Sequence, residues 1–107
     1  MNLYINKLLK YKTNFKAVAL ILDGIDIPTL CNSIKAMDYN DFLYTSYWKY
    51  VRHIKIRQAR CRCQMCGKKH TLLNVHHKTY IHHGLEHLYL SDLIVLCKNC
   101  HKKIHGK

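Results

Sequence analysis

Apolar residues recur at a loosely helical spacing through residues 1–22, so we expect mixed helix there. Residues 15–22 alone are also compatible with a strand, because a short apolar run fits either structure. The pair Asp23-Gly24 indicates a turn, and the proline in residues 28–35 suits the start of a short helix. The first third of the chain is therefore predicted to be mainly helical.

The strongest helical pattern lies in residues 41–58, where apolar and aromatic side chains recur every three or four positions. These side chains form one stripe, which consists of Tyr44, Tyr47, Trp48, Val51 and Ile54. Because the aromatic residues share this stripe with aliphatic ones, we expect them in the core rather than stacked on bases.

Residues 1–40 carry no recognisable chemistry, and we expect them to pack on the rest of the chain or to dock a partner. We therefore divide the chain into an N-terminal extension, residues 1–40, and a module, residues 41–107.

After Gly67 the pattern changes to that of a hairpin followed by a helix. A strand is expected around Leu72 and Val75, a loop through Gly84, and a second strand at residues 93–96. Residues 98–105 should then form a short helix. The predicted fold class is α+β, a small ββα module preceded by helices.

Charge is distributed unevenly along the chain. The formal net charge is +12, of which residues 1–48 carry +1 and residues 49–107 carry +11. All nine histidines also lie from His53 onward. A basic concentration of this kind favours a polyphosphate partner, because each neutralised phosphate releases counterions. We expect a nucleic acid rather than a merely solubilising face.

The longest apolar run, residues 17–22, is far shorter than the roughly 20 residues of a membrane helix. No small-residue cleavage site follows it, so we expect a cytoplasmic protein. Disulfides are therefore not expected from the six cysteines, and four of these form two Cys-x-x-Cys pairs.

The two pairs are Cys63/Cys66 and Cys97/Cys100, with thirty residues between them. Four thiolates can close a tetrahedral structural Zn²⁺ site, and a chain this short benefits from such a staple. Gly67 helps the backbone turn back toward the ion. A Cys₂His₂ site with two idle cysteines is the competing assignment.

If four thiolates bind zinc, the four histidines that accompany the cysteine motifs, at positions 76, 77, 101 and 105, remain for other chemistry. His101 and His105 are one turn apart on the predicted helix and share a face. His76 and His77 are adjacent on a strand and must point to opposite faces, so their roles should differ. One can face a metal shared with the helix pair, and the other can face a reacting group.

These motifs together resemble an HNH endonuclease, in particular a zinc-stapled branch found often in phages and mobile elements. The resemblance covers about residues 45–107, and its order and spacing match over several elements at once. The residues that carry it are Cys63, Cys66, Val75, His76, His77, Gly84, Glu86, Asp92, Leu93, Leu96, Cys97, Cys100, His101 and His105.

The resemblance implies a ββα-metal (His-Me finger) fold and hydrolysis of DNA phosphodiester bonds. By motif position, His77 would be the general base that activates water. His76 and His101 would bind a catalytic divalent ion such as Mg²⁺, and His105 would be a third ligand or a phosphate contact. An imidazole is suited to such a role near neutral pH.

One position departs from the family pattern. The middle Asn, which helps to orient the general base, falls on Asp92. Its carboxylate could still accept a hydrogen bond from His77, or it could only cap a turn.

Other residues receive simpler expectations. The loop histidines His82, His83 and His87 should face solvent, Glu86 should form an internal ion pair or bind loop backbone, and Cys31 and Cys61 should be spare thiols. Phosphate contacts are expected from basic side chains, which position DNA without reading its sequence. These are Arg52, Arg57, Arg60, Arg62, Lys68, Lys69, Lys102 and Lys103.

Two alternatives remain open. The chain could be a zinc-stapled nucleic-acid-binding module without activity, or a nuclease subunit whose residues 1–40 dock on a larger protein that supplies specificity. The charge does not exclude RNA.

Overall fold

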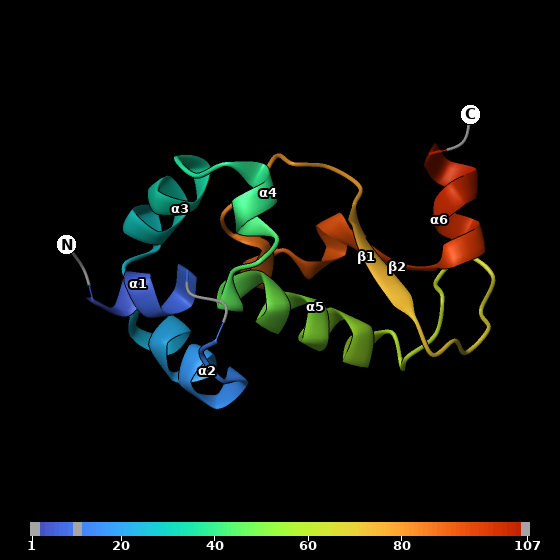
Figure 1. Cartoon of the computed structure of the whole chain (residues 1–107), viewed down its shortest axis with the longest axis horizontal. Helices are drawn as coiled ribbons and strands as arrows, with labels where there is room; N and C mark the ends of the chain where they lie inside the picture. The colour runs from blue at the N-terminus through green and yellow to red at the C-terminus, as the bar shows by residue number, and fades with distance from the viewer. Residues whose placement is uncertain (1–2, 10–11, 106–107) are drawn as a thin grey trace. The chain divides into compact units, whose positions relative to one another are not determined.

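The computed structural model describes residues 3–9 and 12–105, shown in Figure 1. The chain divides into two compact units. Unit 1 comprises residues 1–51 together with 83–85, and unit 2 comprises residues 52–82 and 86–107. Helix α5 (Ser46–Gln58) runs across the boundary between the two sequence ranges.

Unit 1 is helical, as predicted, and polar side chains cap three of its helices at their N-termini. Asn14, Asp26 and Asp38 accept hydrogen bonds from backbone amides in the first turns of α2, α3 and α4. Such a cap stabilises a helix by about 1 kcal/mol. The strand alternative for residues 15–22 is wrong, and α2 continues through the expected turn at Gly24. The helices are α1 (Leu3–Leu9), α2 (Phe15–Gly24), α3 (Ile27–Lys35) and α4 (Tyr39–Phe42).

The predicted helix of residues 41–58 is interrupted, so the prediction of one helix over this range is wrong. Residues 43–45 separate α4 from α5, and the Thr45 hydroxyl accepts from the Trp48 amide at 3.0 Å while it donates to the Phe42 carbonyl at 2.8 Å. The hydroxyl thus begins a new helix. Tyr44 falls in the break and is 66% exposed, so the prediction that it is a core residue is wrong.

The core of unit 1 combines residues from every helix of that unit. Tyr47 and Trp48 are buried there as predicted, and the ring centroids of Phe42 and Trp48 lie 5.4 Å apart. The Ser46 hydroxyl donates to the carbonyl of Lys7, a last-turn residue of α1, at 2.8 Å. The buried apolar residues are Ile5, Leu8, Val18, Leu30, Ile34, Phe42, Tyr47, Trp48 and Val51.

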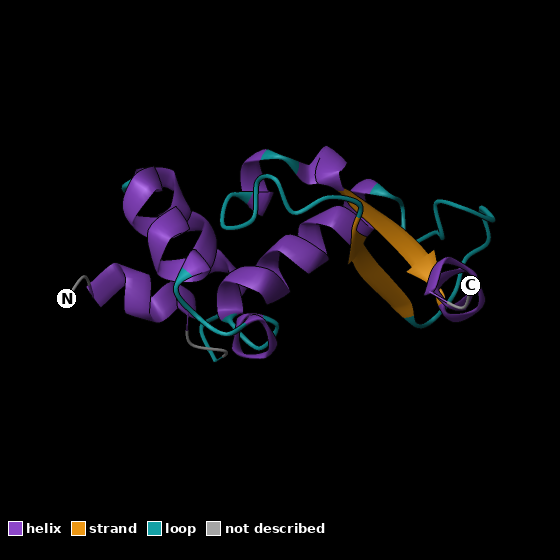
Figure 2. Ribbon diagram, turned by 90° about the horizontal axis from the view of Figure 1, so that it is seen from above, coloured by secondary structure: helices purple, strands orange, loops and turns teal. Residues whose placement is uncertain are grey.

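Unit 2 contains the predicted hairpin and helix. Strands β1 (Leu73–His77) and β2 (Leu93–Cys97) pair antiparallel, with Val75 opposite Val95, and α6 (Lys98–His105) follows β2 directly (Figure 2). Leu93, Val95 and Leu96 are buried. The ββα prediction and the α+β class are confirmed.

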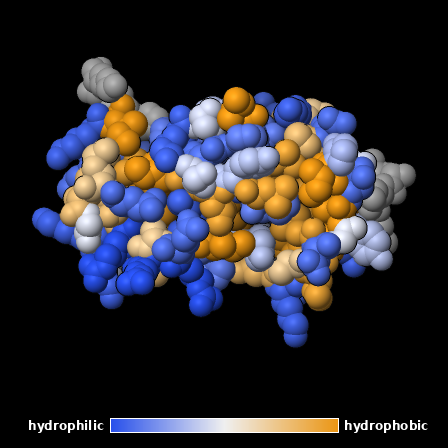
Figure 3. Space-filling view, turned by 180° about the vertical axis from the view of Figure 1, so that it is seen from behind, coloured by the Kyte–Doolittle hydropathy of each residue, from blue (hydrophilic) through white to orange (hydrophobic). Residues whose placement is uncertain are grey.

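The strands of unit 2 are joined by a long segment that contains two short 3₁₀ helices, η1 (Glu86–Leu88) and η2 (Leu90–Asp92). One face of the chain carries hydrophilic residues with hydrophobic patches between them (Figure 3). Leu72 and Ile81, 80% and 74% exposed, are among the exposed apolar side chains. Within the described ranges, every helix is too short or too polar to cross a membrane.

Candidate metal centre and candidate active site

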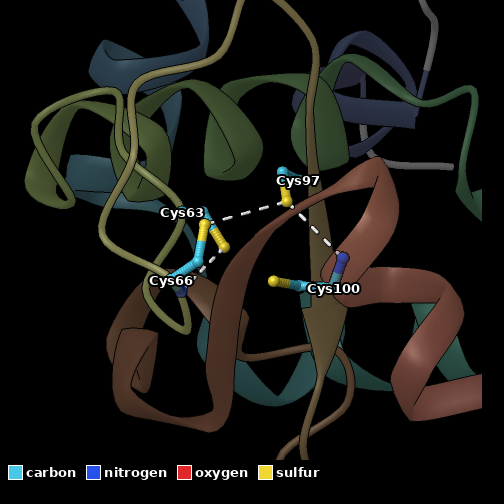
Figure 4. Close-up of side chains that lie close together, drawn as sticks. All are labelled: Cys63, Cys66, Cys97 and Cys100. Carbon is cyan, nitrogen blue, oxygen red and sulfur yellow. Dashed lines mark hydrogen bonds between the residues drawn. The ribbon is translucent and has the colours of Figure 1, made fainter.

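The four cysteines of the two Cys-x-x-Cys pairs converge in unit 2. Their sulfur atoms all lie within 4.8 Å of one another, and Cys66 Sγ is 4.0 Å from Cys97 Sγ (Figure 4). A tetrahedral zinc with Zn–S bonds of about 2.3 Å requires sulfur atoms about 3.8 Å apart. Cys63, Cys97 and Cys100 are buried, whereas Cys66 is exposed. The spacing of the cluster therefore fits one four-coordinate ion.

Local backbone structure explains why the sulfur atoms meet. Gly67 adopts a φ of 77°, and its amide donates to the Cys63 carbonyl at 2.9 Å, which turns the chain back after the first pair. The Cys66 and Cys100 amides each approach the sulfur three residues earlier, Cys63 Sγ and Cys97 Sγ, at 3.5 Å. Both pairs thus form the same tight turn around a sulfur atom.

The first turn is also joined to the hairpin. The Gln64 amide donates to the Val95 carbonyl at 2.8 Å, and the Val95 amide donates to Gln64 Oε1 at 2.9 Å. Gln64 therefore pairs with β2 and brings Cys63 and Cys66 to the end of the strand where Cys97 lies. The long separation of the two pairs in sequence is closed by this contact.

Proton affinities within the cluster differ strongly. Burial raises the pKa of the Cys100 thiol to about 12, and the neighbouring cysteines act in the same direction. Burial also opposes ionisation of Cys63, but hydrogen bonds with the backbone of Cys66, Cys97 and Met65 outweigh it and lower that pKa to about 6. A divalent cation at the centre would balance several thiolates, so the chemistry of the donor set also fits a metal.

The structure brings His76 and His101 together. Their ring centroids, on β1 and α6, lie 5.7 Å apart at an interplanar angle of 70°, and both side chains are half-buried. Metal–nitrogen bonds of about 2.1 Å place a ring centroid about 3 Å from the ion, so two ligating imidazoles lie at most about 6 Å apart. The pair is therefore close enough to share an ion. The His105 side chain lies outside the described part of the chain.

His77, the next residue of β1, lies in a different environment from His76. Its Nε2 is 3.0 Å from Glu86 Oε2, and both side chains are only 2% exposed. The Tyr80 ring stacks on the imidazole, with centroids 4.6 Å apart. Glu86 thus has the internal partner expected for it, and that partner is the predicted general base.

Asp92 contacts His82. Asp92 Oδ2 is 2.6 Å from His82 Nδ1, and the His82 ring stacks on Tyr89 with centroids 3.6 Å apart and an interplanar angle of 3°. The carboxylate beside His77 is therefore that of Glu86, whereas sequence reasoning considered Asp92 for that contact. His82 is half-buried rather than turned to solvent as expected, and so are His83 and His87.

Most of the predicted phosphate-binding residues are exposed in unit 2, but Arg52 is not. Its guanidinium is half-buried and donates to the Leu73 carbonyl at 3.0 Å, which joins α5 to the start of β1. Arg62 is exposed, and its guanidinium lies 3.4 Å from the Gly67 carbonyl. The other exposed basic residues of the prediction are Arg57, Arg60, Lys68, Lys69, Lys102 and Lys103.

Sequence reasoning missed two features of the site. His70 Nε2 lies 3.8 Å from Cys66 Sγ, a contact whose only sequence signal is a histidine four residues after a cysteine. Tyr89 gave no signal at all, because its role depends on the path of the long loop. The spare cysteines are placed as expected, with Cys61 exposed and Cys31 half-buried outside the cluster.

Comparison with known proteins agrees with this geometry. Residues 63–107, which span both cysteine pairs, the hairpin and α6, match the family model described as HNH endonuclease. No curated protein and no solved structure matches the chain. The family and the four-cysteine cluster together indicate a bound metal. Residues 63–107 therefore resemble an HNH endonuclease domain, which indicates a nuclease-type function on nucleic acid.

Proposed function

We propose that the protein is a metal-dependent endonuclease that hydrolyses DNA phosphodiester bonds. The observation that carries the proposal is the pair His76 and His101, which face each other from β1 and α6 inside the segment that matches the family. A module that only binds DNA needs basic side chains and no such pair of metal-binding groups.

The four cysteines hold a structural Zn²⁺ in this proposal. Their sulfur spacing supports it, and so does the small size of the core around them, in which Leu96 packs with three of the cysteines. A closed four-thiolate site leaves no position for substrate. The zinc therefore holds the hairpin against α6 and takes no part in the reaction.

His76 and His101 would hold a second divalent ion, Mg²⁺ or another. When bound, such an ion would stabilise the negative charge that builds up on the leaving oxygen. The half-buried position of both imidazoles is consistent with access from solvent.

His77 is the general base and accepts the proton of the attacking water. Glu86 supports this role because its carboxylate, 3.0 Å from Nε2, fixes the ring and stabilises the imidazolium that forms. The exposed basic residues, among them Arg57 and Lys103, bind the DNA backbone, and RNA carries the same phosphate chemistry.

Cleavage of supercoiled plasmid by the wild-type protein and by His77→Gln, with Mg²⁺ or Mn²⁺, tests the proposal. Glutamine can still donate to Glu86, so it avoids an unpaired buried carboxylate, but it cannot accept a proton. We expect wild-type nicking or linearisation and a loss of about 100-fold or more in His77→Gln.

Zinc content, thermal stability and DNA affinity of the two proteins must be equal in that experiment. Tight, salt-sensitive binding without cutting in any metal would identify a non-catalytic binding module instead. Wild-type rates in His77→Gln would show that His77 is only a buried hydrogen-bond partner of Glu86. If cutting requires another protein that binds residues 1–40, the chain is a nuclease subunit.

A further inference from the structure

Glu86, the partner of His77, lies on the segment between the two strands, so something must hold that segment in place. Residues 83–85 in its middle group with unit 1. The ends of the segment remain in unit 2, where His82 and Asp92 meet at 2.6 Å. This contact closes the loop of residues 82–92, and Glu86 lies inside that loop.

A continuous path of backbone hydrogen bonds links Asp92 to Glu86. The Tyr89 amide donates to the Glu86 carbonyl at 3.1 Å, and the Asp92 amide donates to the Tyr89 carbonyl at 2.9 Å. The Asp92 carbonyl in turn accepts from the amide of Lys78, the residue after His77, at 2.8 Å. This path of hydrogen bonds runs from Lys78, which follows the predicted base His77, through η2 and η1 to Glu86. The Glu86 carboxylate in turn contacts His77.

His82 holds this path at two points. Its Nδ1 contacts the Asp92 carboxylate, and its ring lies parallel to the Tyr89 ring at 3.6 Å. Asp92 and Tyr89 both belong to this path, and both follow Glu86 in the sequence. A side chain that fixes both of them fixes the register of η1 and η2, and with it the position of Glu86.

We propose that His82 is a positioning residue of the nuclease, which holds Glu86 against His77 mainly through its contact with Asp92. The inference rests on the proposed function, because it assigns His77 to the reaction. It also accounts for the carboxylate at position 92: an imidazole stands opposite it, and an aspartate binds a histidine N–H more strongly than an asparagine does.

The test separates the two contacts of His82 by two substitutions in the full chain. His82→Phe keeps a flat ring for Tyr89 but has no donor for Asp92, whereas His82→Gln keeps an N–H donor and loses the ring. Because small misplacements of a catalytic group cost up to about 100-fold, we expect kcat to fall about 10- to 100-fold in His82→Phe. KM for DNA and zinc content should be unchanged, and His82→Gln should recover most of the rate.

A second readout does not depend on cleavage. The side-chain ¹⁵N resonances of His77 should shift in His82→Phe and remain near the wild-type position in His82→Gln. Ser91→Ala, an exposed neighbour of Asp92 in the same loop, is the matched control and should behave as wild type in both measurements.

Wild-type rate and unchanged His77 resonances in His82→Phe would overturn the inference. Equal impairment in Phe and Gln variants, or in Ser91→Ala, would also overturn it, because the hydrogen bond to Asp92 would then not be the cause. If the wild-type protein cuts no DNA, the proposed function fails, but the His77 resonances still decide whether His82 positions Glu86.

Discussion

Lys55 is the clearest case of a single residue that works against stability. Its side chain lies in α5, the residue is only 4% exposed, and Nζ contacts Gln58 Oε1 at 3.1 Å. Burial lowers the pKa of Lys55 below its ordinary 10.5, and nearby Lys78 lowers it further. The charged form is therefore penalised in the folded protein.

We expect Lys55→Met to raise the melting temperature at pH 7, because burial penalises the charged form of the wild-type side chain. Between the lowered folded pKa and 10.5, the folded protein releases a proton that the unfolded chain retains, so wild-type stability rises with pH in that window. The gain from methionine should thus be smaller at pH 10 than at pH 7. Thermal unfolding followed by circular dichroism at both pH values measures it.

Lys102→Met is the control for that experiment, because it removes the same charge from an exposed position. A gain in Lys102→Met equal to that in Lys55→Met would attribute the effect to net charge instead of burial.

At the same scale, long-range partners explain what the sequence did not predict. Arg52 was expected on DNA, yet it donates to the carbonyl of Leu73, which is 21 residues away. The contacts of His77 with Glu86 and of His82 with Asp92 likewise join residues that are nine and ten positions apart through an irregular segment. Spacing rules describe regular helices and strands, and they say nothing about the path of such a loop.

Among the elements, the hairpin and α6 followed from the sequence, because their apolar runs and cysteine spacing leave few alternatives. The predicted strand at residues 93–96 and helix at residues 98–105 agree closely with β2 and α6. The break before α5 did not follow, because a threonine cap inside a helical stripe leaves the apolar periodicity unchanged. The bounds of a helix or strand can therefore be predicted where hydrophobic burial or the spacing of metal ligands determines them. They cannot be predicted where a single capping hydroxyl determines them.

Cys97 joins these elements, since it ends β2, is 3% exposed, and accepts from the Cys100 amide at the start of α6. We expect Cys97→Ser to lower zinc affinity at least about 100-fold, because even outer-shell changes cost 10- to 100-fold. Hydrogen-exchange protection of β2 and α6 should fall with it. Zinc analysis after dialysis and exchange measured by mass spectrometry test both expectations.

Cys61→Ser, at an exposed cysteine outside the cluster, should retain the metal. Full zinc content and undiminished protection in Cys97→Ser would contradict a structural metal at the four cysteines.

For the whole molecule, a net charge of +12 is concentrated in the residues that also carry the cysteine pairs, the hairpin and the histidines. Order and spacing of these motifs predicted the family, and the match over residues 63–107 confirms it. Composition did not predict a role for residues 1–40. The helix caps in this region explain only its local structure. For the C-terminal part we propose two metal ions, one for stability and one for chemistry.

Plasmid cleavage in the presence of EDTA, with zinc content measured on the same sample, tests this account most directly. A closed four-thiolate site should retain its zinc under mild chelation, whereas an ion held by His76 and His101 should be lost. We expect cleavage to stop while one zinc per chain remains, and added Mg²⁺ or Mn²⁺ to restore it. Cleavage that continues in EDTA with zinc still bound would contradict it.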